Sequence, residues 1–368
     1  GQPAAAAADC ALMIESSNEP DRLPNAPHPR EPLALIGHER PEQAFLAALS
    51  SGRLHHAWLL GGPEGIGKAS FAYRAARFLL AEGDPMRRAR TASDLAIPAD
   101  DGATRKIMAQ SHPDLHLLRR IPKPDGKSFT SNIPVDLVRR VLERFGSSAG
   151  EGGWRVCIVD SSEELDRSAG NALLKLLEEP PARTLFLIVA HAPGRLLPTI
   201  RSRCRLLSFE PLSEGDVAAA GRIALERMGL PYDDSALQRA AALSEGSVKR
   251  ALSYVDPETL ALVEAVRARL DALPGVDLPA LLALGEEVAG KAGEAEFAVM
   301  IETVQGWLSG HLHAHAAAGP ARLAPLAEVW ERLARAAREV ETYNLDRRPL
   351  VMSLFHDLSE AVARSRAA

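Results

Sequence analysis

The residues best suited to chemistry form a glycine-rich stretch at positions 61–70. It follows the apolar run 57–60 and precedes a helical pattern, so the sequence predicts a strand, a phosphate-binding turn and a helix. In such a turn, backbone N–H groups and a lysine ammonium hold phosphate oxygens. The residues that match this pattern are Gly62, Gly65, Gly67 and Lys68. A nucleotide pocket is therefore predicted, and a glycine-rich turn that binds nothing is the alternative.

Two further positions indicate that this pocket is impaired. Ala69 stands where a Ser or Thr hydroxyl would hold Mg²⁺, and Ser70 cannot replace it because one helical step turns a side chain by about 100°. Asp160 ends an apolar run, where a second acid of a nucleotide site belongs, although it could simply cap a helix. Ser161 follows where hydrolysing enzymes place a Glu base. We expect ATP or ADP to bind weakly, without Mg²⁺.

The composition limits the classes of protein to consider. With a formal net charge of −5 over 368 residues, the chain is not a nucleic-acid binder that is basic throughout. Its cysteines, Cys10, Cys157 and Cys204, are too few for a disulfide framework or a Cys₄ zinc site, and they suit a reducing cytoplasm. No apolar run approaches about 18 residues, so no membrane span is expected.

The hydrophobic pattern predicts an α/β core followed by helices. Buried strands alternate with amphipathic helices up to about residue 212, which is typical of a parallel sheet flanked by helices. Beyond that point no convincing strand remains. The expected parts are a disordered proline-rich tail at 1–30, the α/β domain at 31–212, a three-helix lid at 213–256 and a C-terminal helical domain at 257–368.

A second signal is the triplet Ser202-Arg203-Cys204, which by itself would be read as an exposed arginine. It follows the block 171–181, which reads NALLKLLEEPP. Together with the phosphate loop and Asp160, this series resembles the clamp-loader group of AAA+ proteins over about residues 33–255. The resemblance implies an AAA+ core, a small helical lid and a C-terminal collar through which subunits assemble.

The resemblance also implies roles for individual residues. Arg203 would be an arginine finger that acts in the ATP site of a neighbouring subunit. The chain's own pocket would be degenerate, and its two sensor positions, at Ala190-His191 and at Lys249 or Arg250, depart from the pattern of active members. The implied partners are the gamma/tau and delta subunits of a bacterial DNA polymerase III clamp loader, a hetero-pentamer that places a sliding clamp on primed DNA.

Two alternatives stay open at this point: an active ATP-hydrolysing motor subunit of the gamma/tau kind, and an inert AAA+ scaffold. Whether the chain is itself an enzyme is therefore uncertain. Many relatives carry a four-cysteine zinc module, but residues 83–113 contain no cysteine, so no zinc is expected there. His311, His313 and His315 have no cysteine or acidic companion, and a solvated helix surface is the preferred interpretation.

Overall fold

The computed structural model describes residues 19–20, 23, 26–124, 128–146, 153–289, 293–316, 319–343 and 345–367. Contacts divide the chain into two compact units. The first comprises Gly1–Pro231 with Ser247–Lys249, and the second comprises Tyr232–Gly246 with Arg250–Ala368.

The first unit is built on a five-stranded sheet in the order β2-β3-β4-β1-β5, and every pair of neighbouring strands is parallel. The strands are β1 (Ala57–Gly61), β2 (Leu115–Leu118), β3 (Arg155–Val159), β4 (Thr184–Ala190) and β5 (Arg205–Ser208). The helices of this unit are α2 (Glu39–Ser50), α3 (Lys68–Leu80), α4 (Pro85–Ala89), α5 (Gly102–Met108), α6 (Val135–Gly146), α7 (Arg167–Glu178), α8 (Pro198–Arg201) and α9 (Glu214–Met228). The predicted parallel sheet flanked by helices is confirmed.

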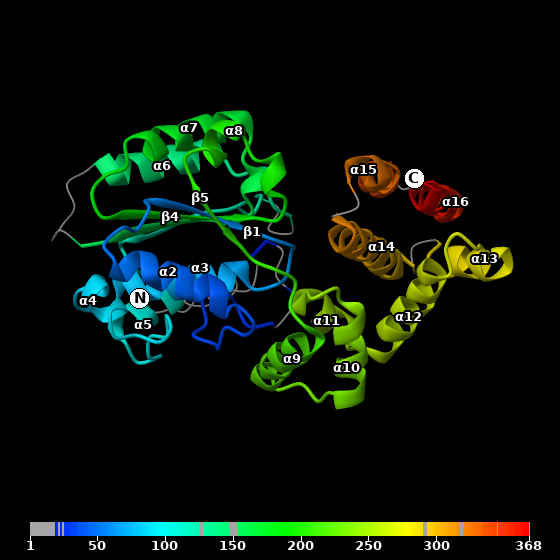
Figure 1. Cartoon of the computed structure of the whole chain (residues 1–368), viewed down its shortest axis with the longest axis horizontal. Helices are drawn as coiled ribbons and strands as arrows, with labels where there is room; N and C mark the ends of the chain where they lie inside the picture. Colours follow the sequence, from blue (N-terminus) through cyan, green and yellow to red (C-terminus); the bar gives the residue numbers. More distant parts are fainter. Residues whose placement is uncertain are drawn as a thin grey trace, which may run out of the picture. The chain divides into compact units, whose positions relative to one another are not determined.

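Helices cover both faces of this sheet (Figure 1). Alternate side chains of β1 point to opposite faces: Trp58 and Leu60 join the core under α2 and α3, and Leu59 joins the core under α6 and α7. Because both faces are covered, the central strands β1, β3 and β4 are buried along their whole length. This explains why they read in the sequence as unbroken apolar runs.

The stretch 83–113 shows no regular hydrophobic period in the sequence, yet it contains helices. It forms the two short helices α4 and α5, each begun by an aspartate cap. The Asp84 side chain accepts from the backbone N–H of Met86, and that of Asp101 accepts from the backbone N–H of Ala103. Such caps satisfy orphan donors at a helix start, so short helices form without an amphipathic repeat.

The predicted disordered tail at 1–30 is only partly described, since residues 1–18, 21–22 and 24–25 lie outside the described residues. Within the described part of this segment, Glu19, His28 and Arg30 are buried and paired. The buried Glu19 carboxylate contacts His28, Arg30 (2.6 Å) and Arg119 (3.1 Å). Burial acts to raise the pKa of Glu19, but these three neighbours hold it well below its usual range.

The second unit is helical in the part that the structure describes. Its helices are α10 (Asp234–Leu243), most of α11 (Val248–Tyr254), α12 (Pro257–Asp271), α13 (Leu278–Glu287), α14 (Glu294–Ala314), α15 (Pro320–Tyr343) and α16 (Arg348–Ala367). Helices α12 to α16 share one apolar core, and α10 packs on α12 around Tyr254. By contacts, α9 belongs to the first unit and α10 to the second. The division into domains at 31–212, 213–256 and 257–368 stays a prediction.

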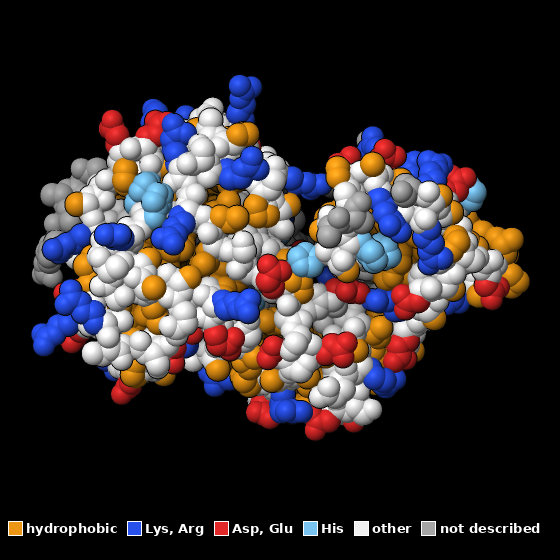
Figure 2. Space-filling model, viewed as in Figure 1, with side chains coloured by type: hydrophobic (Ala, Val, Ile, Leu, Met, Phe, Trp, Pro, Cys, Tyr) orange, Lys and Arg blue, Asp and Glu red, His pale blue; other side chains and the backbone are white. Residues whose placement is uncertain are grey.

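The surface carries charges of both signs. On the face shown in Figure 2, Lys and Arg side chains are interspersed with Asp and Glu, as the small net charge leads us to expect. Among the described helices, none is long and apolar enough to cross a membrane.

Candidate functional site

The phosphate loop lies between the end of β1 and the start of α3, as the sequence predicts. Its glycines are required by their conformation and by their neighbours. Gly62, Gly65 and Gly67 have φ angles of 156°, 76° and 104°, a region that favours glycine. A Cβ on Gly62 would lie 2.2 Å from the carbonyl oxygen of Phe209, and one on Gly65 would lie 2.2 Å from Ser247 Oγ. The loop is therefore tightly packed in its present shape.

Lys68 turns back onto this loop. Its Nζ donates hydrogen bonds to the carbonyl oxygens of Gly62 (2.6 Å) and Pro63, and its side chain is buried. Burial lowers the pKa of Lys68 to about 8, although the nearby carboxylates of Glu163 and Glu64 act to raise it. The ammonium group that would bind a phosphate is therefore hydrogen-bonded to carbonyl oxygens of its own loop.

Residues after β3 and β4 complete the charged surroundings of Lys68. The two strands are neighbours and parallel, so their carboxyl ends meet at one edge of the sheet. Asp160 follows β3 and contributes to the electrostatic field at Lys68. Ser161, with φ at 59°, lies with its Oγ 3.4 Å from Nε2 of His191, which follows β4. Glu163 accepts from the backbone N–H of Ala192 at 2.5 Å.

His191 lies where the resemblance implies a first sensor, a role that stays a prediction. Burial lowers its pKa, and the positive charge of Lys68 lowers it further. The imidazole that contacts Ser161 is therefore uncharged near neutral pH. Its Nδ1 and the Oε2 of Glu163 are buried without a hydrogen-bond partner in the described part of the chain.

Lys249, one of the two residues that the resemblance suggests for a second sensor, also contacts the loop. The backbone N–H of Lys249 donates to the carbonyl of Gly65 at 3.3 Å, and its Nζ pairs with Glu64 at 2.6 Å. Arg250, the other residue that the sequence offered for this position, pairs instead with Glu302 at 3.8 Å in the second unit. Two lysines at the loop are thus balanced by carboxylates of the same chain.

Sequence reasoning did not identify three contacts that shape this site. His38 Nε2 lies 2.5 Å from the carbonyl oxygen of Ile66 and anchors the loop from the start of α2. Glu163 and the Glu64–Lys249 pair were likewise missed as partners of the loop. A His just before a helix carries no sequence signal for such an anchor, because the contact forms only when the chain folds back over 28 positions.

Arg203 contacts residues that are not part of this cluster. It follows α8 and precedes β5, and its side chain is 37% exposed. Its Nη1 donates to the carbonyl of Thr199 at 2.9 Å, and its Nη2 pairs with Glu178 Oε1 at 2.8 Å. The structure therefore brings together Lys68, Asp160 and Ser161, and it holds Arg203 at the surface.

The histidines of α14 form a stack. The rings of His311 and His315 are 4.3 Å apart, and Trp307 stacks on His311 at 5.0 Å. In the described part of the chain, no three His, Cys, Asp or Glu side chains are grouped so that they could hold a metal ion.

Comparisons with known proteins show which proteins this chain is similar to. A family model described as DNA polymerase III, delta subunit, matches residues 37–213. DNA polymerase III subunit delta' of Yersinia pestis is 32% identical over 246 residues, which cover 66% of this chain and 67% of that protein. The delta' subunit of Pseudomonas aeruginosa is 36% identical over 208 residues, covering 56% of this chain and 58% of that protein. The tau subunit of Escherichia coli is 31% identical over 222 residues, which cover 60% of this chain and 32% of that protein.

Among solved structures, a DNA polymerase III gamma subunit-related protein of Thermotoga maritima is similar at 18% identity, covering 88% of this chain and 100% of that chain, with a TM-score of 0.34. The sheet, the phosphate loop and the relatives define an AAA+ protein of the clamp-loader group. Within that group the sequence most resembles the delta-prime subunit, and the relatives confirm it. The chain belongs to the delta-prime subunits of bacterial DNA polymerase III, clamp-loader proteins involved in DNA replication.

Proposed function

We propose that this chain does not hydrolyse ATP and instead supplies Arg203 as an arginine finger to the ATP site of a neighbouring clamp-loader subunit. The observation that carries this proposal is the contrast between two cations. The Lys68 ammonium is buried and engaged by its own loop, whereas the Arg203 guanidinium, in the turn after α8, is partly exposed and contacts Thr199 and Glu178. An exposed guanidinium can reach phosphate oxygens of another subunit and stabilise their developing charge.

The residues of the chain's own pocket do not fit a hydrolysable Mg²⁺–nucleotide. Ala69 offers no hydroxyl for the metal, and Ser161 cannot act as a base at neutral pH. Lys68 would have to leave two carbonyl oxygens before it could hold a phosphate. The pocket would therefore bind ATP or ADP weakly, and neither Mg²⁺ nor zinc is part of the proposed mechanism.

Family membership implies partnership with other clamp-loader subunits. We further infer a hetero-pentamer with gamma/tau and delta subunits in the bacterial cytoplasm. That assembly would place the sliding clamp on primed DNA, and the C-terminal helices would form part of the collar that joins the subunits. Polymerisation itself would be the work of other chains of the holoenzyme.

The test is the DNA-stimulated ATPase rate of the reconstituted loader with Arg203→Ala. We expect the site that the finger serves to lose about tenfold or more of its turnover. Arg201→Ala is the matched control, because Arg201 is an exposed arginine two positions earlier, and it should leave the rate unchanged. A wild-type rate with Arg203→Ala would favour the inert scaffold.

The second candidate is an active motor subunit of the gamma/tau kind. It is favoured by the intact glycine cradle with Lys68 and by tau and gamma relatives at 28–31% identity. Steady-state hydrolysis by the isolated chain separates the two candidates. Robust turnover that Lys68→Met abolishes would overturn the proposal.

A further inference from the structure

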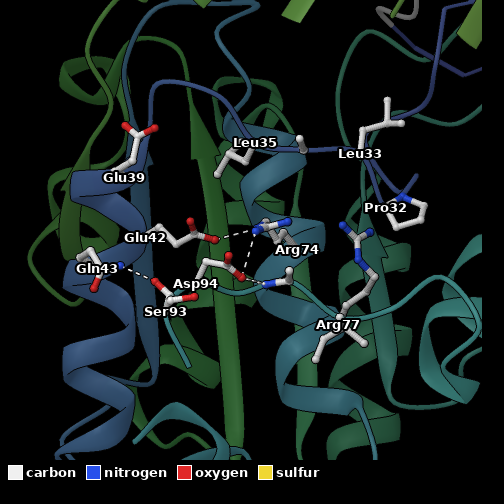
Figure 3. A pocket seen from close by; sticks show the side chains of 13 residues that line it. Pro32, Leu33, Leu35, Glu39, Glu42, Gln43, Arg74, Arg77, Ser93 and Asp94 are labelled. Carbon is white, nitrogen blue, oxygen red and sulfur yellow. Dashed lines mark hydrogen bonds and ion pairs between the residues drawn. The ribbon is translucent and has the colours of Figure 1, made fainter. Parts of the chain in front are cut away.

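A second pocket lies in the first unit, between α2, α3 and the loop 93–97 (Figure 3). Its volume is about 590 Å³, and residues 32–35 line another side of it. None of its lining residues belongs to the phosphate loop at 61–68. The pocket is therefore a separate site, and nothing in the proposed function uses it.

Two arginines one turn apart on α3 line this pocket, and their surroundings differ. Arg74 is neutralised by two carboxylates, since its guanidinium pairs with Glu42 at 2.7 Å and with Asp94 at 3.4 Å. Arg77 is only 2% exposed, and its Nη1 donates one hydrogen bond, to the carbonyl oxygen of Arg30 at 2.7 Å. No carboxylate pairs with Arg77 in the described part of the chain. Figure 3 shows its guanidinium directed toward Pro32, away from Glu42 and Asp94.

A buried guanidinium without a counter-ion is unfavourable. Burial and the charge of Arg74 lower the pKa of Arg77 to about 10. The lowered pKa shows that this environment disfavours the charged form of the guanidinium. A guanidinium carries five N–H donors in a planar fork, and among the described residues Arg77 uses one of them in a hydrogen bond. The group that best complements such a fork is a planar or tetrahedral oxyanion, which accepts parallel hydrogen bonds and supplies the missing charge.

The other walls of the pocket indicate what such a ligand would carry besides the oxyanion. Pro32, Leu33, Leu35 and Ile97 supply apolar surface near the arginine, and each of them is half-buried. Sites for small molecules commonly combine apolar walls with a few placed polar groups.

We propose that this pocket binds a small molecule that carries a carboxylate or phosphate group next to an apolar part. The oxyanion lies on the guanidinium of Arg77, and the apolar part lies against Leu33, Leu35 and Ile97. No residue of the phosphate loop at 61–68 lines this pocket.

The test is calorimetric titration of the full chain with benzoate and with phenyl phosphate, and with neutral benzamide as the matched control. We expect saturable binding of at least one of the two anions and none of benzamide. The anion that binds more tightly distinguishes a carboxylate ligand from a phosphate ligand. Absence of saturable binding by both anions, or equal binding of benzamide, would overturn the proposal.

Variants then test the part played by Arg77. Arg77→Met should weaken anion binding at least tenfold, whereas Arg87→Met, which removes an exposed charge on α4, should leave it unchanged. If Arg77→Met does not fold, Ala96→Phe narrows the pocket from its exposed side and should weaken binding without touching Arg77. If Arg77→Met folds and binds the anion as tightly as the wild type, the site is refuted. If only Ala96→Phe folds, wild-type affinity for the anion in that variant refutes it.

Discussion

Glu178 is expected to restrain Arg203 until a neighbouring subunit competes for it. The two side chains are 2.8 Å apart, and they are 49% and 37% exposed. An ion pair of such exposure is worth about 0.2–1 kcal/mol, which corresponds to a roughly 1.4- to 5-fold change in the released fraction of Arg203. Replacing Glu178 by Gln removes the charge and keeps the shape of the side chain. If Arg203 acts on its neighbour, this substitution should make it more available.

The assay is titration of the chain into a fixed amount of its partner subunits while DNA-stimulated ATP hydrolysis is measured. Glu178→Gln should lower the half-saturating concentration of the chain by about 1.4- to 5-fold, and the difference should shrink near about 1 M salt, where charges are screened beyond about 3 Å. Glu179→Gln is the matched control, since Glu179 is the next residue and is exposed. If Glu178→Gln lowered the rate as Arg203→Ala does, Glu178 would position the finger, and the idea of a restraint would be wrong.

Three further predictions concern stability and are read from chemical unfolding. The free energy of unfolding of the wild type, relative to Lys68→Met, should increase by up to about 1.4 kcal/mol per pH unit as pH rises from about 8 toward 10.5. In this range unfolded Lys68 still holds a proton that folded Lys68 has released. A difference that stays constant with pH would contradict burial of the ammonium. Glu19→Gln should lower the free energy of unfolding by about 3–5 kcal/mol at neutral pH, because it breaks a buried set of ion pairs. This loss should shrink as pH falls below 4.5, where unfolded Glu19 takes up a proton. An equal loss at all pH values would refute the pairing. Gly62→Ala should cost about 1–3 kcal/mol because its Cβ meets the carbonyl of Phe209, whereas Gly194→Ala, with open space around it, should change stability by less than about 0.5 kcal/mol; similar costs would show that the loop adapts.

Much of the fold could be predicted because its signals are local. The unbroken apolar run at 184–190 forms β4, and residues 234–243 form α10. The Ser213 side chain caps α9, because it accepts from the backbone N–H of Asp216 at 3.1 Å. These features depend on periodicity, burial and caps, which a short window of sequence contains.

The prediction was weakest where pairing over long sequence distances decides the structure. Glu19 lies in a proline-rich segment that indicates disorder by composition, yet its carboxylate pairs with Arg119, 100 positions away. The two caps Asp84 and Asp101 were overlooked because α4 and α5 are too short to show a helical period.

The sequence by itself determined that this chain has a phosphate loop without a metal-binding hydroxyl and that it belongs with clamp-loader proteins, because residue type and spacing settle both. Only the tertiary structure decided what the charged groups do. It turned Lys68 onto the carbonyl of Gly62, placed Arg203 against Glu178 and buried Arg77 with no carboxylate partner among the described residues. The reason is physical: the partner of a charge is chosen by the fold, which brings distant residues within hydrogen-bond distance and removes water between them.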